Sequence, residues 1–112
     1  MCKQQYMLAS YLVELDEQQA FLAELVACEQ AYRDEKLITD APIIRMSSKK
    51  YPQFILEIIE FVSAQAVADV MENDHVQVHW VKLAGMWKKG DFPATNIPEA
   101  HLPWALMDAI HL

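Results

Sequence analysis

The sequence predicts an α+β domain whose elements follow the order strand, helix, strand, strand, helix, strand. In four segments, apolar residues alternate with a period of two, which is the pattern of a β-strand. In two longer segments, apolar residues recur with a period near 3.6, as in an amphipathic helix. Two right-handed crossovers would put the first and third strands in the middle of an antiparallel sheet, with both helices on one face. We therefore expect a ferredoxin-like βαββαβ fold.

The composition narrows the class of protein. The chain has 112 residues, of which 54% are hydrophobic and two are glycine, so we expect one compact domain over residues 1–112. The formal net charge of −7 disfavours a nucleic-acid partner. We find no apolar run of membrane-spanning length and no signal-peptide pattern, so we expect no membrane partner and a cytoplasmic location. Cys2 and Cys28 have no metal or redox spacing, which fits a reducing compartment.

The first strand and first helix occupy residues 6–35. Residues 6–15 alternate as a strand, and Ala9, Ser10 and Tyr11 are the positions where it could line a cavity. Asp16 with Gln19 predicts a capping box at the start of a helix that continues to about Glu35. Its apolar stripe is made of Phe21, Leu25, Cys28 and Tyr32. Cys28 is therefore predicted to be a core residue.

The second and last strands are less regular. Residues 37–47 form the second strand, and Pro42 within it places the strand at an edge or at a bulge, because proline cannot donate to a ladder. Residues 47–52 connect it to the third strand. Residues 104–112 alternate as the last strand.

The third strand, residues 53–61, is apolar on both faces. One face carries Phe54, Leu56 and Ile58, and the other carries Ile55, Ile59 and Phe61. Such a strand should be covered on both sides. The two helices would cover one face of the sheet and leave the other face open. That excess of apolar surface favours a second copy of the chain on the open face. Glu57 and Glu60 interrupt opposite faces; an edge salt bridge is the usual outcome, and a buried carboxyl with a raised pKa is the alternative.

The second helix is predicted to begin twice. Ser63 is an N-cap, and the run is then broken at Asn73-Asp74. Asp74 with Gln77 forms a capping box that restarts the helix at an angle, and Gly90 ends it. The core-facing stripe of the second piece is Val76, Trp80, Leu83 and Trp87.

These segments resemble the antibiotic biosynthesis monooxygenase-like family over about residues 7–112. The matching residues are Glu57 to Phe61, Ser63 to Val67 and, above all, Asn73 to Gln77. The resemblance implies a homodimeric α+β barrel, with a pocket between the sheet and the second helix of each subunit. It also implies cofactor-independent oxygenation of a small aromatic or quinol-like compound.

Five residues are candidates for such a pocket. His79 lies at the margin of the second helix's stripe and could act as a base, and Tyr11 could offer its hydroxyl; these two are the catalytic candidates. Trp80, Ser10 and Trp87 are the substrate-binding candidates. The structural alternatives are a half-exposed histidine, core tryptophans and a buried tyrosine. Glu72, His75 and His79 have metal-like spacing, but the helix break separates their faces, so neither a metal nor a cofactor is predicted.

Two departures from the family pattern keep a second function open. In the haem-degrading branch, three characteristic residues correspond to Tyr11, Val70 and Trp80 here, and none is retained. Many family members carry a histidine where this chain has Val70. Haem binding is therefore disfavoured, and a non-catalytic dimer that binds a small apolar or aromatic ligand is the alternative to an oxygenase.

Overall fold

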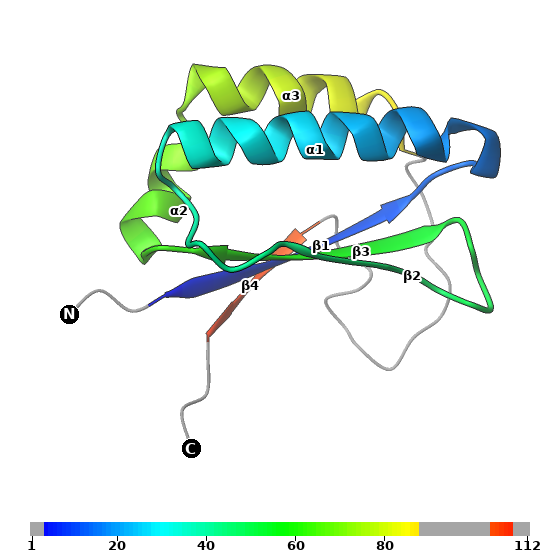
Figure 1. Cartoon of the computed structure of the whole chain (residues 1–112), viewed down its shortest axis with the longest axis horizontal. Helices are drawn as coiled ribbons and strands as arrows, with labels where there is room; N and C mark the ends of the chain where they lie inside the picture. The colour runs from blue at the N-terminus through cyan, green and yellow to red at the C-terminus, as the bar shows by residue number, and fades with distance from the viewer. Residues whose placement is uncertain (1–3, 88–103, 109–112) are drawn as a thin grey trace.

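A computed structural model describes residues 4–87 and 104–108 of the chain. The strands are β1 (Gln5–Leu12), β2 (Ile44–Ser47), β3 (Phe54–Phe61) and β4 (Trp104–Asp108). The helices are a 3-10 turn (Leu15–Glu17), α1 (Gln18–Asp34), α2 (Ala64–Val70) and α3 (Asp74–Ala84). The strands form an antiparallel sheet in the order β2-β3-β1-β4 (Figure 1). The predicted βαββαβ order, with the first and third strands in the middle, is confirmed.

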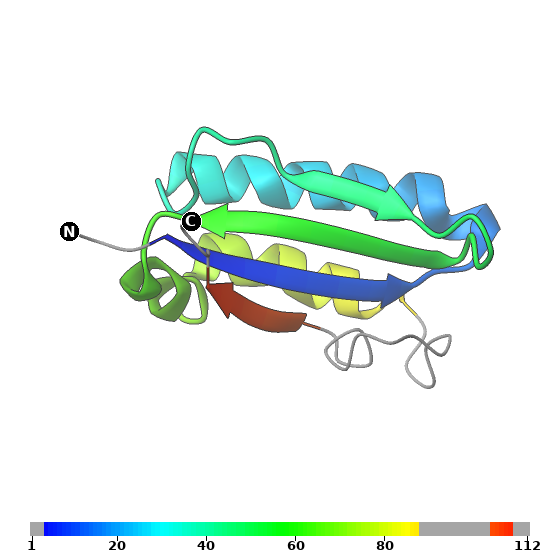
Figure 2. The same ribbon diagram turned by 90° about the horizontal axis from the view of Figure 1, so that it is seen from below.

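The molecule has two layers. α1 and α3 lie beside each other over one face of the sheet (Figure 1), and Figure 2 looks onto the opposite face, with these helices behind it. Strand alternation sorts the central residues between the two faces. On β3, Ile55, Glu57, Ile59 and Phe61 are buried beneath the helices, and the residues between them are half-buried on the other face. The core therefore lies between the sheet and the α1–α3 layer.

The start of α1 differs from the prediction. The chain passes through the 3-10 turn before the helix, and Asp16 caps neither element, because no side-chain cap bond is made at either start. Gln18 holds this corner instead: its Nε2 donates to the carbonyl oxygens of Val13 at 3.4 Å and Pro52 at 2.7 Å. The predicted capping box of Asp16 with Gln19 is wrong, since the tight turn moves the first helical residue past Asp16.

The end of α1 is a Schellman motif. Lys36 has a positive φ of 56°. The Leu37 N–H donates to the Tyr32 carbonyl at 3.0 Å, and the Lys36 N–H donates to the Arg33 carbonyl at 3.1 Å. These are the two bonds that satisfy the last carbonyls of a helix, and Leu37 is buried as the accompanying apolar contact. A lysine occupies the left-handed position where glycine is usual.

The break between α2 and α3 lies where the sequence indicates, with a different cap. Ser63 caps α2 as predicted, since its Oγ accepts from the Ala66 N–H at 3.0 Å. Asn73, not Asp74, caps α3, and its Oδ1 accepts from the Val76 N–H at 3.1 Å. Gln77 does not complete a capping box; its Nε2 donates to the Val70 carbonyl at 2.8 Å and so fastens the two helices at the bend. α3 ends at Ala84, and Gly90, the predicted end, lies outside the described residues.

The second strand is shorter than predicted. Only Ile44–Ser47 pairs continuously with β3, and Ile38 makes an isolated bridge to Phe61. Pro42 lies in the interruption between these two pairings, which agrees with its inability to donate. β2 is an edge strand, as expected. Of the predicted last strand, Trp104–Asp108 is observed, and residues 109–112 lie outside the described residues.

The sheet face turned away from the helices carries apolar side chains. Ile44 and Met46 are 50% and 47% exposed on β2, opposite Ile58 and Leu56 of β3. Glu60 is half-buried on this face, so the expectation that the two carboxylates of β3 lie on opposite faces is confirmed. The homodimer predicted from this surface stays a prediction.

Candidate functional site

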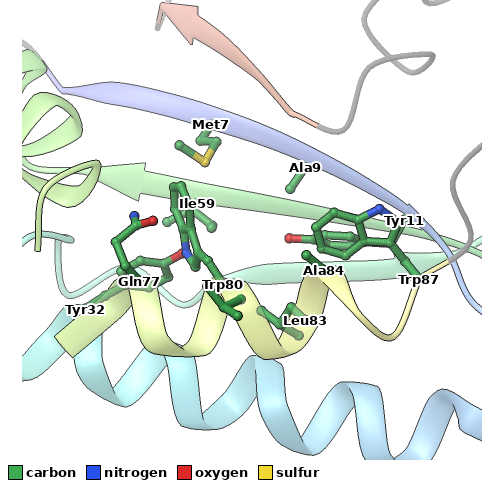
Figure 3. A pocket seen from close by; sticks show the side chains of 11 residues that line it. Met7, Ala9, Tyr11, Tyr32, Ile59, Gln77, Trp80, Leu83, Ala84 and Trp87 are labelled. Carbon is green, nitrogen blue, oxygen red and sulfur yellow. The ribbon is translucent and has the colours of Figure 1, made fainter. Parts of the chain in front are cut away.

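A cavity of about 320 Å³ lies between the sheet and α3. β1, β3, α1 and α3 all contribute to it (Figure 3). Its walls are Met7, Ala9, Tyr11, Tyr32, Ile59, Gln77, Trp80, Val81, Leu83, Ala84 and Trp87. None of the lining side chains that the structure describes is an acid, a base or a histidine, so this part of the wall is apolar with a few hydroxyl, amide and indole groups.

Aromatic rings form two walls of the cavity. The ring of Tyr11 packs against the Trp87 indole with centroids 5.3 Å apart and against Phe21 in an edge-on contact at 4.9 Å. Trp80 donates its indole N–H to the Tyr32 hydroxyl oxygen at 2.8 Å. That bond satisfies the polar edge of Trp80 and fixes the orientation of its ring. The cavity therefore offers flat, apolar surfaces that suit an aromatic ligand.

Tyr11 is the polar group at one end of the cavity. Figure 3 shows its hydroxyl end pointing from the Trp87 side towards Trp80. The hydroxyl donates to Oε1 of Glu57 at 3.2 Å. Glu57 is 2% exposed and lies behind Tyr11 rather than in the cavity wall. The tyrosine thus separates the cavity from a buried carboxylate.

A chain of charged side chains continues from Glu57 to the surface. Arg45 Nε donates to Glu57 Oε2 at 2.9 Å, and Arg45 Nη2 lies 2.9 Å from Glu29 Oε1. Glu29 Oε2 accepts from Arg33 Nη2 at 2.8 Å. Arg45 is able to reach Glu57 because the two residues are direct cross-strand partners on β2 and β3. Every charge in this group has an opposite charge beside it, which a buried carboxylate requires.

Burial governs the ionisation of the two groups at this end of the cavity. It raises the pKa of Tyr11 well above its usual value, and the nearby Glu57 carboxylate raises that pKa further. Burial also raises the pKa of Glu57, against the opposing effect of the Arg45 guanidinium. Tyr11 is consequently a neutral hydrogen-bonding group at neutral pH, and Glu57 is a more basic carboxylate than an exposed one.

The structure brings three of the five candidate residues to the cavity, namely Tyr11, Trp80 and Trp87. Ser10 is turned to the other face of β1, because neighbouring residues of a strand alternate. Its Oγ is buried and has no hydrogen-bond partner among the described residues. His79 is directed at α1, where its Nδ1 lies 3.0 Å from Glu24 Oε2. The place that the sequence predicted for His79 at the pocket edge is therefore not observed.

Sequence reasoning missed several groups of the site. Ala9 lines the cavity, as expected from the first strand, but Met7 was not among the candidates, although the same period-two alternation that selects Tyr11 also selects Met7. Gln77 was assigned to a cap, yet it lines the cavity near the helix bend. The pairing of Glu57 with Arg45 depends on the register of β2 with β3, for which the sequence has no signal.

Cys28 is a buried residue of α1 that lies near Tyr32 and Trp80 and outside the cavity wall. Burial raises the pKa of its thiol to about 11, so the group is neutral in the folded protein. It belongs to the core, as the stripe of α1 predicts. Within residues 4–87 and 104–108, no three histidine, cysteine or acidic side chains are grouped to hold a metal ion. Among the described helices, none has the length and apolar character needed to cross a membrane.

Comparison with known proteins gives matches in structure only. Neither a family model nor a curated protein matches the sequence. The crystal structure of SnoaB, a cofactor-independent oxygenase from Streptomyces nogalater, has a TM-score of 0.74 and 7% identity; the match covers 98% of this chain and 96% of SnoaB. A second crystal structure, named antibiotic biosynthesis monooxygenase, matches with a TM-score of 0.67 and 15% identity over 96% of this chain and 99% of the other.

The chain has the antibiotic biosynthesis monooxygenase-like fold. A conserved protein from Methanosarcina mazei Go1 shares it, with a TM-score of 0.67 and 13% identity over 80% of this chain and 86% of that protein. Identities this low establish the fold and leave the reaction open.

Two residues singled out by the family resemblance lie in different places. Val70 is fully buried and lies outside the cavity wall, whereas Trp80 lines the cavity. No histidine is among the lining residues that the structure describes, so they offer no imidazole to ligate a haem iron.

Proposed function

We propose that this chain binds a small aromatic or quinol-like compound between the sheet and α3 and oxygenates it with dioxygen, without a cofactor. The observation that carries the proposal is an apolar cavity with tryptophan walls, in which the hydroxyl of one lining tyrosine, Tyr11, is backed by a buried carboxylate. The fold shared with SnoaB, which is named as a cofactor-independent oxygenase, supports the reaction class.

The cavity fits the binding part of this proposal. Its volume of about 320 Å³ is at the lower end of the range for small-molecule pockets, which favours a compact ring system. Trp80 and Trp87 supply faces for ring packing, and Tyr11 supplies a polar group that fixes the orientation of the ligand. A ligand with one ionisable hydroxyl at the edge of its ring system matches this distribution.

The reaction needs an electron-rich anion that dioxygen can oxidise. Loss of a proton gives the substrate anion, which transfers one electron to dioxygen. The substrate radical and superoxide then combine to a peroxide, which regains the proton. In an anthrone-type substrate, loss of water from this peroxide converts the ring CH₂ group into a carbonyl, so that substrate and O₂ become quinone and H₂O. In this scheme Tyr11 hydrogen-bonds the anion, and the apolar walls exclude bulk water from it.

Oxygen uptake with a panel of anthrones and hydroquinones tests the proposal. We expect turnover by the wild type, a loss of about tenfold or more in kcat/KM for Tyr11→Phe, and a raised KM for Trp87→Leu. Val78→Ala is the matched control on α3, because Val78 is exposed and lies outside the cavity wall. If the wild type consumes oxygen no faster than Tyr11→Phe on any compound of the panel, the oxygenase is ruled out.

A non-catalytic binding protein is the second candidate. Two observations favour it: the lining formed by the described residues contains no charged side chain and no histidine, and the Tyr11 proton is already donated to Glu57. This alternative predicts that aromatic ligands raise the melting temperature by mass action while no oxygen is consumed. Measurement of both quantities on the same compounds distinguishes the two functions.

We also propose that the chain acts as a homodimer through the sheet face that the helices leave open. Exposed Ile44 and Met46 on that face support this proposal. Sedimentation equilibrium at micromolar concentration should give twice the chain mass, and Met46→Lys should shift the protein towards the monomer. A wild type that stays monomeric under these conditions would contradict the proposal.

A further inference from the structure

We propose that Tyr11 and Glu57 form a proton relay, in which a ligand hydroxyl gives its proton to Tyr11 while Tyr11 gives its own proton to Glu57. Arg45 is the positioning residue that holds Glu57 for this transfer. The relay rests on the proposed function and narrows the substrate class to hydroxyarenes, or their enol forms, whose hydroxyl reaches Tyr11.

The geometry separates the two roles. Tyr11 lines the cavity, whereas Glu57 does not. Of these two residues, a ligand can therefore contact only Tyr11. That hydroxyl already donates to Glu57 Oε1 at 3.2 Å, and its oxygen keeps a lone pair for a proton from the cavity side. A general base must lie within hydrogen-bond reach of the proton it removes, directly or through one water. In the relay, the Tyr11 hydroxyl takes the place of that water.

The transfer balances without any further reactant. The ligand O–H bond breaks, and its proton bonds to the Tyr11 oxygen. At the same time the Tyr11 O–H bond breaks, and its proton bonds to Oε1 of Glu57. The products are a ligand anion, a neutral tyrosine and a carboxylic acid. Because both protons move together, no tyrosinate forms, which agrees with the raised pKa of Tyr11.

The charged chain behind Glu57 makes protonation of this carboxylate tolerable. Before the transfer, two carboxylates balance the two guanidinium groups, namely Glu29 and Glu57 with Arg33 and Arg45. After it, Arg45 still has Glu29 at 2.9 Å, so no buried cation loses its only partner. The group then carries one net positive charge, which attracts the new anion across Tyr11.

Within the part of the chain that the structure describes, few groups influence the pKa of Glu57. The titratable or charged groups that influence it from the neighbouring elements are Tyr11 on β1, Arg45 on β2, and Cys28, Glu29 and Tyr32 on α1. Cys28 is neutral because its pKa is about 11, and burial raises the pKa of Tyr32 well above its usual value. Burial has the largest effect on the pKa of Glu57 and raises it, Arg45 has the next largest and lowers it, and Tyr11 and Glu29 have smaller effects. The net result is a raised pKa, which makes Glu57 a suitable proton acceptor.

Anaerobic titration with 4-nitrophenol tests the relay without any oxygenation. The phenolate of this probe is coloured, so its absorbance between pH 5 and 9 reports the ionised fraction of the bound probe. We expect the probe to ionise at a pH at least about one unit lower when bound to the wild type, a tenfold larger ratio of anion to phenol. Glu57→Gln and Tyr11→Phe should bind the neutral probe within about threefold of the wild type and lose this displacement.

Matched controls keep the test decisive. Val78→Ala should retain the displacement, because Val78 lies outside the cavity wall. Should Glu57→Gln fail to fold, infrared difference spectra of the wild type provide a second readout, since protonated Glu57 gives a carboxylic-acid band when the bound probe ionises. An unchanged displacement in folded Glu57→Gln, or the absence of that band, would overturn the relay.

The relay and the proposed oxygenase can fail separately. A displacement lost in Glu57→Gln, together with no oxygen uptake on any compound, would keep the relay and remove the oxygenase. Oxygen uptake by folded Glu57→Gln at the wild-type kcat/KM, with an unchanged pH profile, would keep the oxygenase and overturn the relay.

Discussion

Arg45, on the edge strand β2, holds the buried carboxylate of Glu57 on β3 through a 2.9 Å bond from Nε to Oε2. The two side chains project from directly paired positions onto the helix-covered face of the sheet. The outermost strand of the sheet therefore supplies the counter-charge for a carboxylate in its interior.

Arg45→Met should destabilise the protein by about 3 kcal/mol at pH 7, because it leaves Glu57 buried without a cation. We expect the lower end of the usual cost, since the Arg45 side chain is 22% exposed. The pKa of Glu57 is already raised in the folded state, and loss of Arg45 raises it further. A raised folded-state pKa gives stability that is present at low pH and lost as pH rises through that pKa. The deficit should therefore shrink between pH 7 and 5.

Urea unfolding at several pH values measures this effect. Arg45→Met/Glu57→Gln is the control, because it removes the charge that responds to pH. Between pH 7 and 5, the free energy of unfolding of the double variant should not rise towards the wild-type value as that of Arg45→Met does. A deficit in Arg45→Met that stays constant from pH 7 to 5 would contradict the assignment of Glu57 as the unpaired charge.

Cys28 should resist thiol reagents in the native protein. It is 2% exposed, and burial raises its pKa from 9.0 to about 11. Because the folded-state pKa is the higher one, stability should be retained below pH 9 and fall between pH 9 and 11, by about 2 to 3 kcal/mol in total. Cys28→Ala should flatten this part of the stability profile. In a Cys2→Ser background, labelling of Cys28 at pH 8 as fast as in urea would contradict its burial.

Lys36→Gly should stabilise the protein by about 1 kcal/mol. Lys36 has a φ of 56° at the end of α1, and a left-handed conformation costs a residue with a Cβ about 1 to 2 kcal/mol. Glycine removes that cost, although it loses some backbone entropy on folding. Thermal unfolding should show a higher Tm for Lys36→Gly and little change for Lys36→Ala. Equal or lower stability of the glycine variant would contradict a strained lysine.

His79→Ala should lower stability while leaving the cavity intact. The His79 imidazole lies 3.0 Å from Glu24 and links α3 to α1, so we expect a loss of about 1 to 2 kcal/mol. Affinity for an aromatic ligand should stay within about twofold of the wild type. Trp80→Leu, which removes a cavity wall, should weaken the same ligand about tenfold or more. A large loss of ligand affinity in His79→Ala would contradict the placement of His79 outside the cavity.

The layout of the fold follows from patterns that are local in sequence. Period-two alternation locates the strands, Ser63 marks the start of α2, and the Asn73-Asp74 pair marks the bend. The choice between Asn73 and Asp74 as the cap depends on which of them has extended backbone angles, and adjacent polar residues do not reveal this. The start of α1 was misplaced for a related reason, because a 3-10 turn absorbs the residues around Asp16.

The site was predictable only where a single face decides the position. Tyr11, Trp80 on α3 and Trp87 just after α3 are predictable because the face on which each lies is unambiguous. α3, however, contacts both the sheet and α1, so a residue at the margin of its stripe can turn to either. His79 turns to α1, where Glu24 attracts it. The ion pairs around Glu57 depend on strand register and on a helix distant in sequence, which no local pattern contains.

The central position of β1 has a consequence for how the protein could change over time. Its odd-numbered residues, Met7, Ala9 and Tyr11, wall the cavity, whereas Leu8 and Ser10, both buried in the single subunit, point to the opposite face of the sheet, where self-association is proposed. Ligand preference therefore depends on one set of alternate residues of β1 and self-association on the other set, so substitutions can alter either property without the other. A one-residue insertion or deletion within β1 would turn each of these side chains to the opposite face of the sheet and abolish both properties at once.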